Sequence, residues 1–176
     1  ACEGCFRNSG QRCTAVRRIL VQEGVLADFT QRFLARAQNY TCGDPTDEAT
    51  VVGTVIDEAA AKSLEAAIQD AITRGAKLLH GGTRQGALLQ PTILADVPRD
   101  STLGTCECFG PIAPIFGVRD LNDAIDHANA TPYGLSSGIV TRSLDSAITA
   151  IKGIKAGTIN VNEIPGYRLE LSPFGG

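Results

Sequence analysis

Two short segments that lie far apart in the sequence contain the side chains best suited to chemistry. The first, residues 6–13, ends in the thiol of Cys13, which follows a Gly-Gln turn and precedes an apolar, β-branched segment. A cysteine on a tight turn at a strand edge can be exposed to a substrate while its backbone N–H stays available to a developing oxyanion. The second, residues 107–111, offers a carboxylate, an aromatic ring and a Gly-Pro turn, which could bind a ribose and stack on a flat cofactor ring.

These segments resemble the active-site cysteine signature and the Glu-x-Phe-Gly-Pro cofactor motif of the aldehyde dehydrogenase superfamily, and they occur in the family's order. Residues 131–135 and 172–176 are similar to two further strings of this family, so the resemblance covers essentially the whole chain. It implies an enzyme in which Cys13 attacks an aldehyde to form a thiohemiacetal. Hydride then passes to NAD or NADP, and water hydrolyses the resulting thioester to a carboxylic acid.

The resemblance also implies roles for individual residues in cofactor binding. Glu107 resembles the residue that hydrogen-bonds the nicotinamide ribose, and Phe109 the residue that packs against the nicotinamide side of the cofactor. The backbone N–H of Cys13 would hold part of the oxyanion. Without the resemblance, the simpler interpretation is a solvated carboxylate and a core aromatic ring. Asn8 and Gln11 are interpreted as turn residues.

Arginine side chains near these segments favour a small anionic substrate. The planar guanidinium of Arg12, directly before the nucleophile, matches phosphonate, phosphate or carboxylate oxygens. Arg168 is a second candidate substrate contact and Phe174 a third, although a surface arginine that only faces water is the alternative for both cations. Residues 162–168 look most like phosphonoacetaldehyde dehydrogenases. Lactaldehyde and non-phosphorylating glyceraldehyde-phosphate relatives are alternatives, as is a non-catalytic binding module with the same fold.

The chain has six cysteines, which raises the question of a metal site. Cys2 and Cys5 have zinc-knuckle spacing, but Cys106 and Cys108 are separated by one residue, where structural zinc sites usually have two to four. Neither histidine adjoins a cysteine pair. We therefore expect reduced thiols and no metal, with a thiol-based metal or redox module at Cys2 and Cys5 as the alternative.

Composition limits the possible partners and the domain organisation. The net charge is −3 and the 16 basic residues are scattered, which argues against a nucleic-acid partner. No apolar run has the length of a membrane span and no signal pattern begins the chain, so a cytoplasmic location is expected. The chain lacks methionine, the family's general-base Glu string and a Gly-x-Gly-x-x-Gly loop.

From these absences we expect residues 1–176 to form one catalytic, thiol-bearing domain of a longer protein. The cofactor-binding domain and the oligomerisation segment would be missing. NAD or NADP would then be bound mainly by the missing domain, and the isolated fragment would be inactive. The resemblance implies that the full-length protein is a homo-oligomer.

The pattern of apolar residues predicts the elements that position these side chains. Strands are expected at residues 17–22, 76–79, 90–94, 112–118, 135–141 and 158–162, the fourth being bent or at an edge because of Pro114. Between them lie helices, of which three begin at the N-caps Asp57, Asp120 and Ser143, the last ending at Gly157. This alternation predicts an α/β fold, a mostly parallel open sheet flanked by helices.

Overall fold

A four-stranded sheet with the order β1-β6-β5-β2 forms the centre of the fold in a computed structural model that describes residues 1–176. β6 (Ile112–Val118) pairs in parallel with β1 (Ile19–Gln22) and β5 (Thr92–Ala95), and β2 (Lys77–His80) is antiparallel to β5. The expected α/β class with a mostly parallel sheet is therefore confirmed. The expectation that Pro114 puts its strand at an edge is wrong, because β6 is central and Pro114 is fully buried opposite Leu94.

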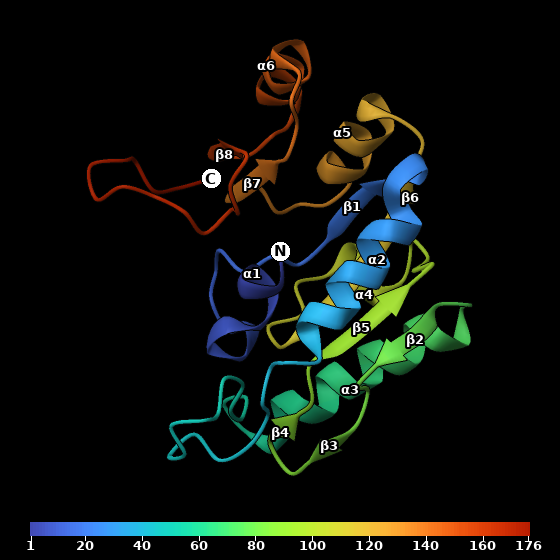
Figure 1. The fold of residues 1–176 in the computed structure, drawn as a ribbon, viewed down its shortest axis with the longest axis vertical. Coiled ribbons are helices and arrows are strands. Elements are labelled where there is room, and N and C mark those ends of the chain that lie inside the picture. The colour runs from blue at the N-terminus through green and yellow to red at the C-terminus, as the bar shows by residue number, and fades with distance from the viewer.

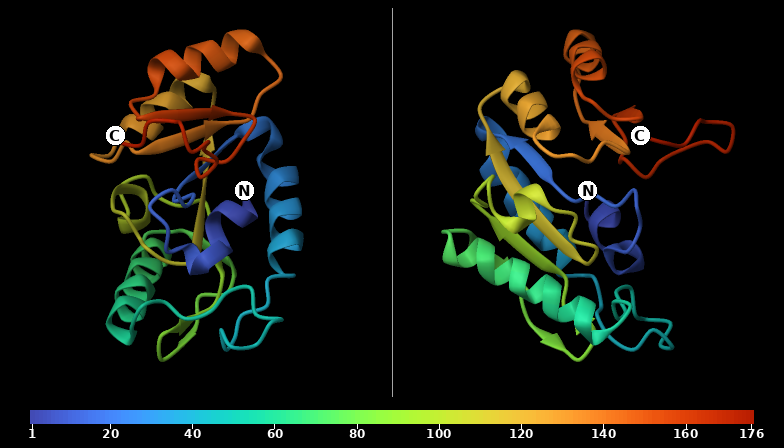
Figure 2. Two further views of the ribbon diagram at one scale, coloured as in Figure 1. Left: turned by 90° about the vertical axis from the view of Figure 1, so that its left-hand side faces the viewer. Right: turned by 180° about the vertical axis from the view of Figure 1, so that it is seen from behind.

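Helices cover both faces of this sheet, as Figure 2 shows. Ile112 and Phe116 of β6 belong to an apolar cluster with α3 (Glu58–Thr73). Ala113 and Ile115, which point to the opposite face, belong to a cluster with α1 (Cys2–Phe6) and α2 (Glu23–Ala37). Burial on both faces explains why β6 is apolar along its whole length instead of alternating with polar residues.

The three predicted N-caps begin helices in the structure. Asp57, Asp120 and Ser143 each accept a hydrogen bond from the backbone N–H three positions later, at 2.7, 2.9 and 3.2 Å, at the starts of α3, α5 (Leu121–Asn129) and α6 (Leu144–Gly153). α6 ends at Gly153, before the expected end at Gly157, because the backbone of Ile154 is extended.

The chain after α5, residues 131–176, has a sheet of its own, and we call it the C-terminal lobe and residues 1–130 the larger unit. Its strands β7 (Ser136–Ile139) and β8 (Thr158–Val161) pair in parallel with each other and do not join the four-stranded sheet. In Figure 1 they lie with α6 and the C-terminus in the upper part of the view, to the left of α5. Ala147 and Ala150 of α6 are buried, but three larger apolar side chains of this helix remain exposed: Leu144 by 74%, Ile148 by 41% and Ile151 by 48%.

Several short elements were not expected from the sequence. They are the short helices α1 and α4 (Thr102–Thr105), the 3₁₀ turn η1 (Arg7–Gly10) and the hairpin of β3 (Arg84–Gln85) and β4 (Leu88–Leu89). None of the helices combines the length and the hydropathy that a bilayer-spanning segment needs.

Candidate active site

The pairing of β1 with β6 brings the two predicted segments together. Cys13 lies in the chain that leads into β1, and Phe109 lies in the chain that leads into β6. Because the two strands are parallel neighbours, with Ile19 opposite Ile115, their amino ends meet at one edge of the sheet. The loop that carries Cys13 and the loop that carries Phe109 therefore lie side by side, although more than ninety residues separate them in the sequence.

The turn before Cys13 is left-handed. Asn8, Ser9 and Gly10 have φ angles of 55°, 54° and 67°, and the N–H of Gln11 donates to the carbonyl of Asn8 at 2.9 Å. Such a run is rare for residues that carry a Cβ atom. At Gly10 a Cβ atom would collide with the carbonyl oxygen of Gly110, so the two predicted segments touch backbone to backbone here.

Side chains of the same turn anchor it to the loop between α2 and α3. The Ser9 hydroxyl donates to the carbonyl of Gly53 at 3.0 Å. The Gln11 amide donates to the carbonyl of Thr54 at 3.3 Å and accepts from the N–H of Ile56 at 2.8 Å. These bonds give Gln11 a structural role in holding the turn.

Arg17 joins the two segments, and the sequence analysis missed it. Its Nη1 donates to the carbonyls of Gly10 at 2.6 Å and of Cys108 at 3.1 Å, and its Nη2 donates to the carbonyl of Arg12 at 2.8 Å. The guanidinium carbon also lies 4.6 Å from the centroid of the Phe109 ring. The only feature of the sequence that could have pointed to Arg17 is its position, as a charged residue just before the apolar segment of β1.

Cys13 has an exposed thiol, whereas most of the other cysteines are covered. Burial raises the pKa of Cys5 to about 12 and that of Cys108 to about 11, so both stay protonated at neutral pH. Cys106 is the other exposed cysteine. Only Cys13 combines exposure with the turn that contacts the second predicted segment.

The proposed cofactor residues are both accessible beside this turn. The Glu107 side chain is exposed, and the Phe109 ring is 41% exposed with Arg17 over one of its faces. Both side chains are therefore accessible to a ligand.

Arg12 is a half-buried cation without an acceptor. Its Nε and Nη2 atoms are inaccessible to solvent and have no hydrogen-bond partner. The loop after β8 packs against Arg12. Gly166 of this loop lies so close that an added Cβ atom would be 3.7 Å from Arg12 Nη1 and 3.3 Å from Thr14 Oγ1. Two donors of this guanidinium are therefore left unpaired inside the protein.

Arg168 and Phe174 make their contacts with each other. The guanidinium carbon of Arg168 lies 4.8 Å from the centroid of the Phe174 ring, and its Nη2 donates to the carbonyl of Ser172 at 3.5 Å. Both side chains are exposed in the loop after β8. The structure therefore brings Cys13, Arg12, Glu107 and Phe109 into one region and keeps Arg168 paired within its own loop.

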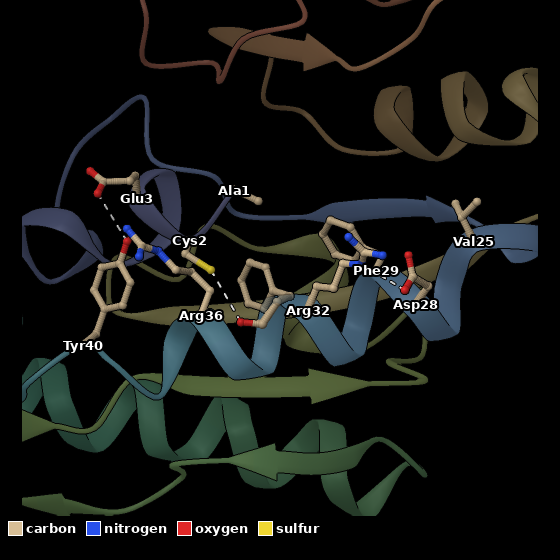
Figure 3. Close-up of a pocket in the computed structure, with 10 residues that line it drawn as sticks. Ala1, Cys2, Glu3, Val25, Asp28, Phe29, Arg32, Arg36 and Tyr40 are labelled. Atoms are coloured by element: carbon tan, nitrogen blue, oxygen red, sulfur yellow. Dashed lines mark hydrogen bonds and ion pairs between the residues drawn. The ribbon is translucent and has the colours of Figure 1, made fainter.

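A groove of about 470 Å³ between α1 and α2 lies apart from these residues (Figure 3). Cys2 lines it and donates through its thiol to the carbonyl of Phe33 at 3.6 Å, and Tyr40 donates to Glu3 at 3.4 Å. No group of three or more His, Cys, Asp or Glu side chains in the structure is arranged to hold a metal ion.

The chain is similar to proteins of one family over its whole length. The Aldehyde dehydrogenase family matches residues 1–176. A lactaldehyde dehydrogenase from Methanococcus aeolicus is 35% identical over 173 residues, which are 98% of this chain and 37% of that protein.

Solved structures agree with this match. Aldehyde dehydrogenase 21 from Physcomitrella patens, in complex with the reaction product succinate, superposes with a TM-score of 0.95 at 35% identity, over 99% of this chain and 36% of that one. The glyceraldehyde-3-phosphate dehydrogenase GapN from Methanocaldococcus jannaschii, complexed with NADP, has the same TM-score at 37% identity, over 99% of this chain and 38% of that one. The chain thus spans just over a third of the length of the relatives it matches.

Proposed function

Because the chain belongs to the aldehyde dehydrogenase family, we propose that it provides the nucleophile of an NAD(P)-dependent enzyme that oxidises an aldehyde to a carboxylic acid. The observation that supports this most directly is the contact between the two turns. Gly10 touches Gly110, and Arg17 bonds to carbonyls of both segments, so the thiol and the aromatic face belong to one local arrangement.

In this function Cys13 is the nucleophile. Its thiolate forms a bond to the aldehyde carbon, and the backbone N–H of Cys13 donates to the oxyanion that develops. NAD or NADP, when bound, supplies the acceptor for the hydride that leaves the thiohemiacetal carbon. Water then cleaves the thioester, which releases the carboxylic acid and restores the thiol.

Glu107 and Phe109 would hold the reactive end of the cofactor. The exposed carboxylate of Glu107 would accept hydrogen bonds from the ribose hydroxyls, and the open face of Phe109 would limit where the nicotinamide ring can lie. Residues outside these two turns would bind the rest of the nucleotide. NADP is present in the Methanocaldococcus jannaschii structure, and either nucleotide fits the two contacts proposed here.

The proposed substrate is a small anionic aldehyde, such as a phosphonoaldehyde. The support is the Arg12 guanidinium, whose buried Nε and Nη2 have no acceptor in the protein. Lactaldehyde and glyceraldehyde phosphate are the alternatives, and the two relatives named for them differ in whether their substrate carries a phosphate.

Competition at the thiols tests the nucleophile. Limiting iodoacetamide at neutral pH should label the exposed Cys13 and Cys106 before the buried Cys2 and Cys5, as followed by peptide mass spectrometry. Phosphonoacetaldehyde should slow the labelling of Cys13 through a reversible thiohemiacetal and leave Cys106 unchanged. If aldehydes protect neither thiol, or both equally, Cys13 is not the nucleophile.

The same assay tests the anion site. Arg12→Ala should weaken protection by phosphonoacetaldehyde by about 10- to 100-fold, on the order of 1.5–3 kcal/mol for a lost charge-assisted bond. Protection by the uncharged propanal should stay nearly the same. Equal losses for both aldehydes would mean that Arg12 only shapes the turn around Cys13.

A further inference from the structure

We propose that Arg17 is a positioning residue that fixes the Cys13 turn and the Phe109 turn in one arrangement, so that the reactivity of the Cys13 thiol depends on it. This role rests on the proposed function, which assigns chemistry to Cys13 and Phe109. It concerns a side chain that acts through those two residues, since its own hydrogen bonds are to backbone carbonyls.

The hydrogen bonds of Arg17 fix the backbone on both sides of the link. Its acceptors are the carbonyls of Gly10 and Arg12, both in the turn that carries the thiol, and the carbonyl of Cys108, next to Phe109. A planar guanidinium presents donors in a fixed fork, so one side chain can bond to three carbonyls that diverge in direction. A lysine ammonium, which is compact and strongly hydrated, cannot hold the same set at once.

The same guanidinium also fixes the aromatic ring. Its carbon lies 4.6 Å from the centroid of Phe109, within the distance at which a cation over a ring is stabilising. One face of the ring is therefore covered by Arg17, while 41% of the residue stays exposed. Loss of Arg17 would therefore free the ring as well as the backbone on either side of the link.

The charge of Arg17 lies close to both proposed functional groups. Burial lowers the pKa of the guanidinium, and the nearby carboxylate of Glu107 counteracts this effect. The guanidinium remains charged at neutral pH because its ordinary pKa is far higher.

Arg18 provides a matched control. It is the next residue, it is also half-buried, and it makes three similar bonds: to the carbonyls of His127 at 2.7 Å and Ala128 at 2.9 Å and to the Thr131 hydroxyl at 3.3 Å. These acceptors lie at the end of α5 and just after it, so Arg18 makes the same kind of contact away from the two turns.

The test compares Arg17→Lys, Arg17→Met and Arg18→Lys in the 176-residue chain. Iodoacetamide should label the exposed Cys13 and Cys106 while the buried Cys2 and Cys5 stay unlabelled, and this second result is the check that each variant is folded. Both Arg17 variants should lower the ratio of the Cys13 rate to the Cys106 rate by about fivefold or more, because the turn that presents the Cys13 thiol is then no longer held through the carbonyls of Gly10 and Arg12. Arg18→Lys should leave this ratio within about twofold of the unmodified chain.

Hydrogen exchange provides the second readout. In the Arg17 variants, peptides that cover residues 8–13 and 107–110 should exchange faster together, whereas in Arg18→Lys the increase should lie in α5. If Arg17→Lys keeps the ratio of the Cys13 rate to the Cys106 rate of the unmodified chain, the positioning role is overturned, because a positive charge without the fork of hydrogen bonds would then be enough to maintain the reactivity of Cys13. Labelling of Cys2 and Cys5 in both Arg17 variants would also overturn it, since Arg17 would then be required for the fold itself.

Failure of the proposed function would look different. If aldehydes do not protect Cys13 in the unmodified chain but the Arg17 variants still loosen both turns, the link made by Arg17 is supported and the nucleophile assignment is wrong. If aldehydes protect Cys13 and the Arg17 variants leave both turns and the thiol ratio unchanged, the function stands and the positioning role is overturned.

Discussion

At the scale of single residues, the left-handed turn before Cys13 depends most on Gly10, which has a φ of 67° and no room for a Cβ atom against the carbonyl of Gly110. Gly10→Ala should therefore lower the free energy of unfolding by about 2–4 kcal/mol, from backbone strain and from displacement of the neighbouring turn. Urea denaturation measures this loss.

Gly24 is the control for that substitution. It lies in the first turn of α2, and a Cβ atom added there would have nothing within 4 Å, so Gly24→Ala should be neutral or stabilise the chain by up to about 1 kcal/mol. Similar losses for both variants would mean that the contact between Gly10 and Gly110 contributes nothing specific.

The sequence could predict some site residues and not others, for a physical reason. The motifs around Cys13, Glu107 and Phe109 are local strings, so their residue types and spacing are visible before any fold is known. The role of Arg17 exists only because β1 and β6 are neighbours, and no local pattern states which strands pair. The contacts of Arg168 likewise depend on how its loop folds.

At the scale of elements, α5 packs a buried histidine against β6. His127 is 3% exposed, its ring meets Phe116 edge-on with centroids 4.7 Å apart, and neither ring nitrogen has a hydrogen-bond partner. Burial, together with the positive charges of Arg99 and Arg18, lowers the pKa of His127 to about 4, and Asp123 opposes this shift.

This histidine should make stability depend on pH. Between the ordinary histidine pKa of about 6.5 and the folded value, the unfolded chain binds the proton and the folded chain does not, so stability falls as the pH falls. From pH 7 to pH 5 the free energy of unfolding of the unmodified chain should fall by about 1–2 kcal/mol more than that of the His127→Leu variant, since the variant lacks the group that titrates. Urea denaturation at both pH values checks this, and parallel losses would contradict it.

Prediction of the elements themselves succeeded where the cause was local. The N-caps Asp57, Asp120 and Ser143 were identified because a cap needs only its own side chain and the next turn of helix. The edge position expected for the strand of Pro114 was wrong. That expectation considers only that proline lacks a backbone N–H for pairing with a neighbouring strand. Burial of β6 between two helix layers decided its place instead.

At the scale of the whole molecule, the larger unit and the C-terminal lobe differ in how well they are packed. β5 and β6 are almost entirely buried, whereas β7 and β8 form a two-stranded sheet whose residues are all partly or fully exposed. Two strands alone are marginally stable in water. Peptides from residues 136–161 should therefore exchange amide hydrogens at least about tenfold faster than those from residues 92–118.

Mass spectrometry of the exchanged chain gives this comparison directly. Equal protection of the two regions would show that the C-terminal lobe opens only together with the larger unit. The sequence predicted β7 and β8 as strands but not as a sheet of their own, because their apolar residues show the same periodicity as those of strands in the main sheet.

The contact between Gly10 and Gly110 also has a consequence for the order of events during synthesis. The thiol leaves the ribosome well before residues 108–110, but its surroundings include carbonyls and a ring from those residues and depend on β6 pairing with β1. Closing a loop of this length costs chain entropy, and contacts distant in sequence form late. A nascent chain therefore carries Cys13 as an ordinary free thiol until β6 has been made, and only then does that thiol acquire its specific neighbours.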